Sequence, residues 1–279
     1  MSLTCGLGAL GRDVFVRPDL VVDRGQASGE LVDLSGDTLS VLAQEREPLL
    51  FLSVPADTIH LMSESDTASI SSYWDAAAAS FDDEVDHGLR DPQARSAWAE
   101  RLRSWMPRPP ADVLDLGCGT GSLSLLLAEQ GHRPVGVDLS PLMVEQARRK
   151  LTAAGFDIAL MTGDASDPPA AAGHSFDVIL VRHLLWTLPD PEGALRRWTG
   201  LLRPGGRLVL VEGRWQTPAD DQPYAAESEP LPWLGGVTAE RLLQALRPFT
   251  TDLRAEPLTD PDLWGRPIHD ERYAVIAHP

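Results

Sequence analysis

One glycine-rich stretch decides the fold of this 279-residue chain: Val113-Leu114-Asp115-Leu116-Gly117-Cys118-Gly119-Thr120-Gly121. The apolar residues before the glycines predict a buried strand, and residues 122–130 after them predict a helix. Glycines at such a turn permit positive φ angles and let a ligand approach the backbone closely. The stretch therefore predicts a strand–turn–helix unit that binds a ligand.

Strands and helices alternate on both sides of this stretch. After it, apolar runs predict strands at residues 134–137, 158–161, 176–181, 207–211, 251–255 and 272–277. Helices are expected between them at residues 140–154, 190–202 and 238–246, and before the glycines in two places, one capped by Ser71 and Ser72 and one begun by Asp91-Pro92. The alternation predicts an α/β fold with an open, mostly parallel sheet covered on both faces.

Two acids and the spacing of the glycines indicate the kind of ligand. Asp138 follows the next strand, 23 residues after Asp115, at a place where an acid accepts hydrogen bonds from ribose hydroxyls. The fingerprint of dinucleotide-binding proteins requires glycine or alanine at position 122, which is serine here. A carboxylate such as Asp115 repels a pyrophosphate and attracts a cation. The turn therefore suits a positively charged ligand without phosphates.

With these residues the sequence resembles the class I S-adenosylmethionine-dependent methyltransferases, close to the small-molecule branch of ubiquinone/menaquinone-type and natural-product enzymes. The resemblance covers the chain from about Tyr73 to the C-terminus. It implies a Rossmann-like, doubly wound, seven-stranded sheet and S-adenosyl-L-methionine as the cofactor. Five motifs carry it, in order and each at a strand end: residues 113–121, 136–143, 163–165, 175–179 and 201–206.

The resemblance also assigns cofactor-binding residues from one end of the ligand to the other. These are Asp115 and the backbone of Gly117, Cys118, Gly119 and Gly121 at the methionine part, Asp138 at the ribose diol, Leu139, Met143, Asp164 and Ala165 around the adenine, and Tyr73 closing over the cofactor.

Several of these residues have a purely structural alternative. Met143 is also a natural core-filling side chain, and Tyr73 is equally suited to helix packing. Asp164 is alternatively a solvated loop acid. For Cys118, a small turn residue is a better description than a reactive thiol.

The acceptor end of the site is expected just after the fourth strand. There, the resemblance places His183 facing the sulfonium and the acceptor. Imidazole titrates near neutrality, which suits a general base, although a packing or contact role is equally open. Arg182 binds an acidic substrate group or pairs with a nearby aspartate, the second being favoured, and Trp186 is a further substrate-binding candidate.

A second contribution to the acceptor site is expected from the segment after the fifth strand. Residues 213–236 read as a lid-like insert that contains Trp215, Tyr224 and Trp233 among prolines and acids. Trp215 and Trp233 are the substrate-binding candidates here, lining a flat apolar site. The alternative is a surface loop whose aromatic side chains tuck into the body.

Composition excludes several classes of protein. Lys and Arg number 24 against 41 Asp and Glu, a net charge of −17, which makes the chain a poor binder of nucleic acid or of anionic membranes. Two cysteines, Cys5 and Cys118, form no disulfide framework, so a reducing cytoplasm is expected. No acidic metal cluster is recognised, so no metal is expected. Together with the charge, this predicts a small apolar or cationic acceptor.

The expected domain organisation is an extension followed by one domain. Residues 1–61 are either a small β-rich extension or residues upstream of a true start at Met62. Residues 62–279 form the methyltransferase domain, divided into a helical cap (62–110), a cofactor-binding core (111–212), the lid-like insert (213–236) and a C-terminal helix and strands (237–279).

The function expected from the sequence is methyl transfer from S-adenosyl-L-methionine to O, N or C of a small-molecule acceptor. The enzyme is expected to be cytoplasmic and a monomer or homodimer. Two alternatives stay open: a nicotinamide-dependent oxidoreductase of the same fold class, and a module that binds the cofactor or a metabolite without catalysis.

Overall fold

A computed structural model describes residues 64–173, 175–215 and 231–279, together with five short strands in residues 1–63. The chain separates into two compact units, Met1–Leu61 and Met62–Pro279. In the first unit, β1 pairs with β2, and β3, β5 and β4 form a second small sheet. The strands of that unit are β1 (Cys5–Gly6), β2 (Asp13–Val14), β3 (Val22–Asp23), β4 (Thr38–Ala43) and β5 (Leu50–Pro55).

The second unit contains the α/β fold. Its elements are α1 (Glu64–Ala77), η2 (Phe81–Asp83), α2 (Val85–Gly88), α3 (Pro92–Trp105), β6 (Asp112–Leu116), α4 (Ser122–Glu129), β7 (Arg133–Asp138), α5 (Pro141–Ala153), β8 (Ala159–Thr162), η3 (Ala170–Ala172), β9 (Phe176–Arg182), η4 (Leu185–Thr187), α6 (Pro191–Gly200), β10 (Leu202–Arg214), α7 (Ala239–Leu246), η5 (Arg247–Phe249), β11 (Asp252–Pro257), η6 (Pro261–Leu263) and β12 (Glu271–His278).

Seven strands form the sheet of this unit, in the order β11-β12-β10-β9-β6-β7-β8. The five strands from β10 to β8 run parallel, and β12 is antiparallel to both of its neighbours. The chain leaves β6 toward β8 and then returns to place β9 on the other side of β6. Since ligands of doubly wound sheets bind where the strand order reverses, the site lies at the carboxyl ends of β6 and β9.

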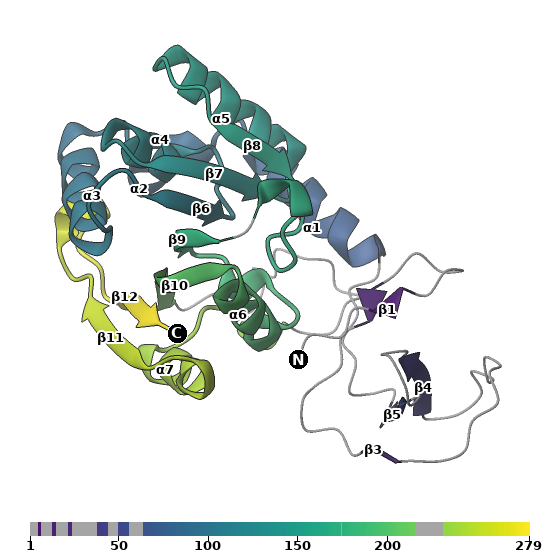
Figure 1. Ribbon diagram of the computed structural model, residues 1–279. Helices are drawn as coiled ribbons and strands as arrows, with labels where there is room; N and C mark the ends of the chain where they lie inside the picture. The colour runs from purple at the N-terminus through teal and green to yellow at the C-terminus, as the bar shows by residue number, and fades with distance from the viewer. Residues whose placement is uncertain are drawn as a thin grey trace. The chain divides into compact units, whose positions relative to one another are not determined.

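Apolar side chains cover both faces of the sheet. On one face, Trp98, Leu102 and Trp105 of α3 pack with residues of α4 and with Val113 of β6. On the other face, residues of α6 and α7 pack with Leu114 of β6. Figure 1 shows the sheet between these helices, with α3 and α4 on one side and α6 and α7 on the other. The mostly parallel seven-stranded α/β fold expected from the sequence is confirmed.

Local cap signals set most of the helix starts. Asp91 accepts from the amides of Gln93 and Ala94, which begins α3, and Ser140 accepts from the amide of Met143 in α5. The expectation that Ser71 and Ser72 cap a helix is wrong, because both residues lie inside α1. The Ser/Asp-rich start of α1 lacks the apolar repeat that would have revealed it.

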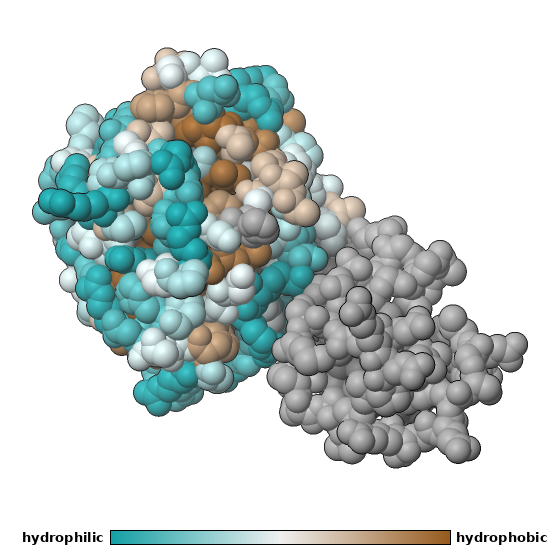
Figure 2. All heavy atoms as spheres, viewed as in Figure 1, coloured by the Kyte–Doolittle hydropathy of each residue, from teal (hydrophilic) through white to brown (hydrophobic). Residues whose placement is uncertain are grey.

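The surface of the described residues is mixed in character. Figure 2 shows polar residues over much of the viewed face, with apolar residues gathered between them. Tyr73, Val85 and Leu142 are the exposed large apolar side chains among the described residues. Among these residues, no helix combines the length and apolar character that crossing a bilayer requires.

Candidate functional site

The glycine turn after β6 is held against the neighbouring strand. The amides of Gly117 and Cys118 both donate to the carbonyl oxygen of Val137, at 2.8 and 3.1 Å. Gly117, Gly119 and Gly121 have φ angles of +69°, +53° and +75°, which glycine adopts readily. A side chain at position 121 would also lie 2.9 Å from Cβ of Ala147. The turn predicted from the sequence therefore requires its glycines.

Asp138 lies at the end of β7 and faces this turn. Its Oδ2 accepts from the amide of Gly119 at 2.8 Å, and its Oδ1 accepts from the amide of Ser140 at 2.9 Å. Burial raises the pKa of the carboxyl, which is 8% exposed. A carboxylate has about four lone-pair positions, so each oxygen keeps one for a ligand. This geometry suits the ribose diol.

Asp115 is more deeply placed than its predicted role suggests. The residue is 2% exposed, and its Oδ2 accepts from the Ser124 hydroxyl of α4 at 2.6 Å. Burial raises the pKa of this carboxyl to about 6, and the nearby Asp138 adds to the shift. Its hydrogen bond to α4 makes Asp115 a support of the glycine turn. Its contact with the methionine part of a cofactor stays a prediction.

Helix α1 docks beside Asp138. The Ser71 hydroxyl donates to the carbonyl oxygen of Leu139 at 3.3 Å. Oδ1 of Asp75 accepts from the Ser140 hydroxyl at 2.5 Å and from the Leu142 amide at 3.1 Å. Tyr73, on the same helix and 43% exposed, is thereby brought to the cofactor edge of the sheet.

The residues predicted around the adenine are partly committed to packing. Met143 is 1% exposed, which is the burial of a core side chain. Oδ1 of Asp164 accepts from the Ser166 amide at 2.7 Å, so the acid orders the loop after β8. The carbonyl oxygen of Ala165 accepts from the Trp198 indole at 2.8 Å.

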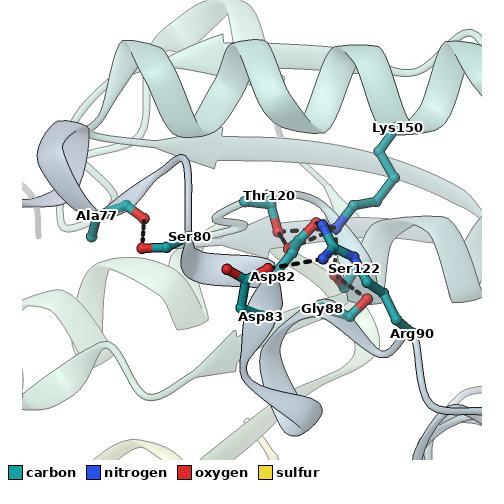
Figure 3. Close-up of polar contacts among 9 residues, drawn as sticks. All are labelled: Ala77, Ser80, Asp82, Asp83, Gly88, Arg90, Thr120, Ser122 and Lys150. Atoms are coloured by element: carbon teal, nitrogen blue, oxygen red, sulfur yellow. Dashed lines mark hydrogen bonds and ion pairs between the residues drawn. The ribbon is translucent and has the colours of Figure 1, made fainter.

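A network not predicted from the sequence connects η2 to the glycine turn. Asp82 accepts from the Thr120 hydroxyl at 2.5 Å and lies 2.9 Å from Nζ of Lys150. Lys150, the single lysine of the chain, also donates to the hydroxyls of Thr120 and Ser122 at 3.0 and 2.7 Å. Figure 3 shows the lysine of α5 reaching down to these side chains and Arg90 reaching up to them from below. The network ties three segments together at the cofactor edge.

Phe81 of the same η2 segment extends over the turn. Its ring lies 3.5 Å from the place that a Cβ on Gly119 would take. The ring stacks on the imidazole of His87 with 4.3 Å between centroids. The Asp82 network therefore positions an aromatic ring beside the backbone predicted to hold the cofactor.

The place predicted for the acceptor end holds a compact group that we call the arginine–tryptophan cluster: Arg182, His183, Trp215, Trp264 and Arg272. His183 has a φ of +52°, an uncommon conformation that is found most often at functional sites. Its ring stacks on Trp264 with 5.8 Å between centroids and lies 5.2 Å from that of Trp215.

Both arginines of the cluster lie against indole rings. The Arg182 guanidinium is 4.3 Å from the Trp98 ring and donates to Asp86 at 2.9 Å. The Arg272 guanidinium is 5.0 Å from the rings of both Trp215 and Trp264. Asp270 accepts two hydrogen bonds from Arg272, at 2.7 and 2.9 Å. Arg182 thus has the aspartate partner that its sequence context favoured.

His183 is electrostatically unlike a general base. Burial, followed by the charges of Arg182 and Arg272, lowers the pKa of the imidazole well below its ordinary value of 6.5. Nε2 of His183 faces Nη1 of Arg272 at 3.5 Å. The ring is therefore neutral but a weak proton acceptor, which counts against the base role.

Glu212, near the end of β10, is a further residue that sequence reasoning missed. It is fully buried, and its Oε1 accepts from the amides of Leu184 and Leu185, both at 3.0 Å. Burial raises the pKa of this carboxyl to about 7. Oε2 is buried without a hydrogen-bond partner among the described residues. The acid supports the loop that carries His183.

The remaining aromatic candidates separate into two groups. Trp186 lies edge-on to Trp74 and Trp215, with centroid distances of 6.4 and 5.9 Å, so it borders the acceptor end. Trp233 is 3% exposed within the core on the α6/α7 face. The expectation that Trp233 lines the acceptor site is therefore replaced by core packing. Tyr224 lies outside the described residues.

Sequence reasoning missed Phe81, Asp82, Trp264 and Arg272 because their partners are distant in the chain. The bonded aspartate of Arg272 is local, but the rings around it come from other segments. The single lysine was the one available signal for the Asp82 network. Within the described ranges, no group of three or more His, Cys, Asp or Glu side chains is placed to hold a metal ion.

The fold defines a class: a doubly wound α/β domain with a glycine turn and a buried acid at the switch point of its sheet. Comparison with known proteins then shows a similarity over part of the chain. Residues 114–210 match the family model described as a methyltransferase domain. This match agrees with the resemblance to S-adenosylmethionine-dependent methyltransferases that the motifs indicated.

The relatives agree with this family. The chain is 38% identical to the demethylmenaquinone methyltransferase of Thermus thermophilus over 38% of its own length and 49% of the relative. It is 40% identical to the aklanonic acid methyltransferase DauC of a Streptomyces species, over 36% of this chain and 46% of that protein. The chain thus spans about half the length of these curated relatives.

A solved structure shows the same fold. The magnesium protoporphyrin IX methyltransferase of Synechocystis superposes with a TM-score of 0.54 and 16% identity, over 79% of this chain and 100% of that protein. At this identity the similarity concerns the fold alone.

Proposed function

We propose that this protein is an enzyme that transfers a methyl group from S-adenosyl-L-methionine to O, N or C of a small-molecule acceptor. The observation that carries the proposal is the placement of Asp138 and the glycine turn at the switch point, next to the arginine–tryptophan cluster. One half of this edge suits a nucleoside, and the other half suits a flat second ligand. Methyl transfer requires both at the same place.

The residues at the turn fit this cofactor. Asp138 keeps lone pairs for two ribose hydroxyls while its other positions hold the amides of Gly119 and Ser140. Lys150 beside the turn is paired with Asp82, so its charge is already compensated. A phosphate would need that charge, whereas the sulfonium of S-adenosylmethionine is compatible with the surrounding carboxylates. The donor set therefore favours this cofactor over a nicotinamide dinucleotide.

The cofactor supplies an activated methyl group, so the chain mainly supplies proximity and alignment. Asp138 would orient the ribose, and Leu139 would flank the adenine. Phe81, Trp186 and Trp215 would exclude water and hold the acceptor flat against the carboxyl edge. His183 and the arginines would contact the acceptor. A proton transfer is required only when the nucleophilic atom carries a proton.

A labelled-methyl assay tests this proposal. The full chain is incubated with S-adenosylmethionine carrying a labelled methyl group and a panel of phenolic, amine, indole and carboxylate acceptors. Label transfer to at least one acceptor is expected, together with its loss in Asp138→Ala. Tight binding of S-adenosylhomocysteine with no transfer to any acceptor would instead indicate a module that binds without catalysis.

The proposal includes cellular context. A cytoplasmic location is supported by the presence of two cysteines in the chain, of which Cys118 is buried and free. A lack of nucleic-acid or anionic-membrane partners is supported by the net charge of −17. The oligomeric state we propose is a monomer or homodimer. Residues 62–279 would carry the activity, with residues 1–61 as an extension.

A further inference from the structure

The arginine–tryptophan cluster has the chemistry of a site for a planar anion. The side chains of Arg182 and Arg272 are 10% and 13% exposed, so both guanidinium groups are largely enclosed. Indole rings lie on both, and the partly exposed ring of Trp215 beside Arg272 would also stack with a flat ligand. A planar guanidinium matches a carboxylate or phenolate in geometry and charge.

Each arginine already has one carboxylate partner, so the cluster has no large excess charge. A ligand would bind to N–H groups that do not donate to the aspartates. Nε of Arg182 is buried and has no hydrogen-bond partner among the described residues. Nη1 of Arg272 has only the long 3.5 Å approach to His183. Asp86 and Asp270 therefore fix the two guanidinium groups, and Nη1 of Arg272 is the donor that remains for a ligand.

His87 adds a third polar group on the same side. Its Nδ1 is buried without a partner among the described residues, and its Nε2 lies 3.7 Å from Asp86. Burial and the charge of Arg182 lower the pKa of this imidazole, as they do for His183. Both histidines are therefore neutral at physiological pH, and the site lacks a strong base to deprotonate an acceptor.

We propose that the acceptor is a planar acid that binds as its oxyanion to Arg272, beside the Trp215 ring. The inference rests on the proposed methyl transfer and names the substrate class of that site. It replaces the apolar or cationic acceptor expected from the overall charge, because the local donors are those of an anion site.

An ionised acceptor also removes the need for a base. An electron pair of the acceptor oxyanion forms the new bond to the methyl carbon, and the bond between that carbon and sulfur breaks with its pair going to sulfur. A negative oxygen and a positive sulfonium become a neutral ester or ether and a neutral sulfide. No proton moves, so a neutral His183 is compatible with the reaction. Bound beside Arg272, the acid also has a lowered pKa.

Binding of a matched pair of probes tests the inference. The probes are 3-hydroxy-2-naphthoate and 3-hydroxy-2-naphthamide, which share shape but differ in charge at neutral pH. Calorimetry with the full chain, saturated with S-adenosylhomocysteine, is expected to show the naphthoate binding about tenfold tighter or more, the size of one charge-assisted hydrogen bond. Equal binding of the amide, or binding of neither probe, would overturn the proposal.

Variants of single residues test which side chain causes the tighter binding of the naphthoate. Arg272→Gln is expected to reduce the naphthoate preference to about threefold or less, and Arg272→Lys to retain part of it because the charge remains. Arg254→Gln, on β11 with a side chain that is 56% exposed, is the matched control and should keep the preference. Thermal melts of the variants identify any loss of folding. A preference that survives Arg272→Gln in a folded protein contradicts the assignment.

The labelled-methyl assay separates this inference from the proposed function. Transfer to both probes at similar rates would leave the methyltransferase proposal intact and remove the acid preference. A tenfold binding preference with no transfer to any acceptor would do the reverse. The expected outcome is transfer to the naphthoate with a kcat/KM about tenfold or more above that of the amide.

Discussion

The carboxyl edge of the sheet has two halves with opposite chemistry. Around the ends of β6 and β7, the charged side chains are carboxylates such as Asp115 and Asp138, held by a hydroxyl and by backbone amides. Around the end of β9 and the start of β12, they include two arginines that are packed against indole rings and are each paired with an aspartate. A cationic cofactor and an anionic acceptor would each meet compensating charge, side by side. Transfer between them then cancels charge at the reacting atoms.

The largest expected effect lies on the cofactor half. Asp138→Ala removes the acceptor for the ribose diol and for the Gly119 amide, so binding of S-adenosylhomocysteine should weaken by roughly a hundredfold, or about 3 kcal/mol. Isothermal titration calorimetry measures this change. Asp157→Ala, at an exposed acid of the same domain, is the control. Unchanged affinity in Asp138→Ala would remove the ribose role and with it the comparison between the halves.

The unfolding free energy is expected to depend on pH through the carboxyl of Glu212. Its folded-state pKa of about 7 lies above the ordinary 4.5, so the unfolded chain releases this proton at lower pH than the folded one. Stability contributed by the protonated group is complete below about 4.5 and is lost as pH rises to 7. The loss is on the order of 3 kcal/mol.

Glu212→Gln isolates the contribution of this carboxyl to the pH dependence of stability, because the amide keeps the shape of the side chain but does not titrate. Urea unfolding of both proteins at several pH values is expected to show the free energy of the wild type falling relative to the variant between pH 5 and 8. Asp115 and other groups titrate in both proteins and cancel. Parallel pH curves would show that Glu212 has an ordinary pKa.

The ion pair between Lys150 and Asp82 is expected to stabilise the fold around the glycine turn. Either Lys150→Met or Asp82→Asn is expected to cost about 1–3 kcal/mol of unfolding free energy, because one partner is left enclosed without the other. The double variant should cost less than the sum, by about 1 kcal/mol. The side chains are 19% and 14% exposed, which limits solvent screening.

An exposed pair on the same helix provides the matched control. Glu145 and Arg149 form an ion pair in α5, with side chains that are 48% and 66% exposed. Their double-mutant cycle is expected to give a coupling of about 0.5 kcal/mol or less. A Lys150–Asp82 coupling as small as that of the control would mean that the network does not hold η2 on the turn.

The two halves also differ in how much of them was predictable. The cofactor half was found from sequence because its signals are local: the glycine turn, the acid after β7, and the cap residues Asp91 and Ser140 act within a few residues. The same reasoning placed the start of α1 too late, since Ser71 and Ser72 resemble caps but lie in mid-helix.

The acceptor half was largely hidden, because its contacts join distant segments. The indole of Trp98 donates to the carbonyl oxygen of Leu263, 165 residues away, which fixes the region of Trp264. Arg272 meets His183 across 89 residues. Apolar periodicity says which face of an element is buried but not which element covers it. The sequence therefore indicated His183 and Trp215 without the arginine between the rings.

The smallest expected effect concerns that arginine's stacking partner. Trp215→Leu removes one of the two rings beside Arg272 and should weaken binding of 3-hydroxy-2-naphthoate about threefold, because a partly exposed cation–π contact contributes about 0.5–1 kcal/mol. Trp215→Phe should recover most of the affinity, since it restores an aromatic face. Calorimetry of the three proteins decides the matter. If the Leu and Phe variants bind the naphthoate with equal affinity, Trp215 acts through its volume and not through its aromatic face. Trp264 would then be the one aromatic ring beside Arg272 that distinguishes the acceptor half from the cofactor half.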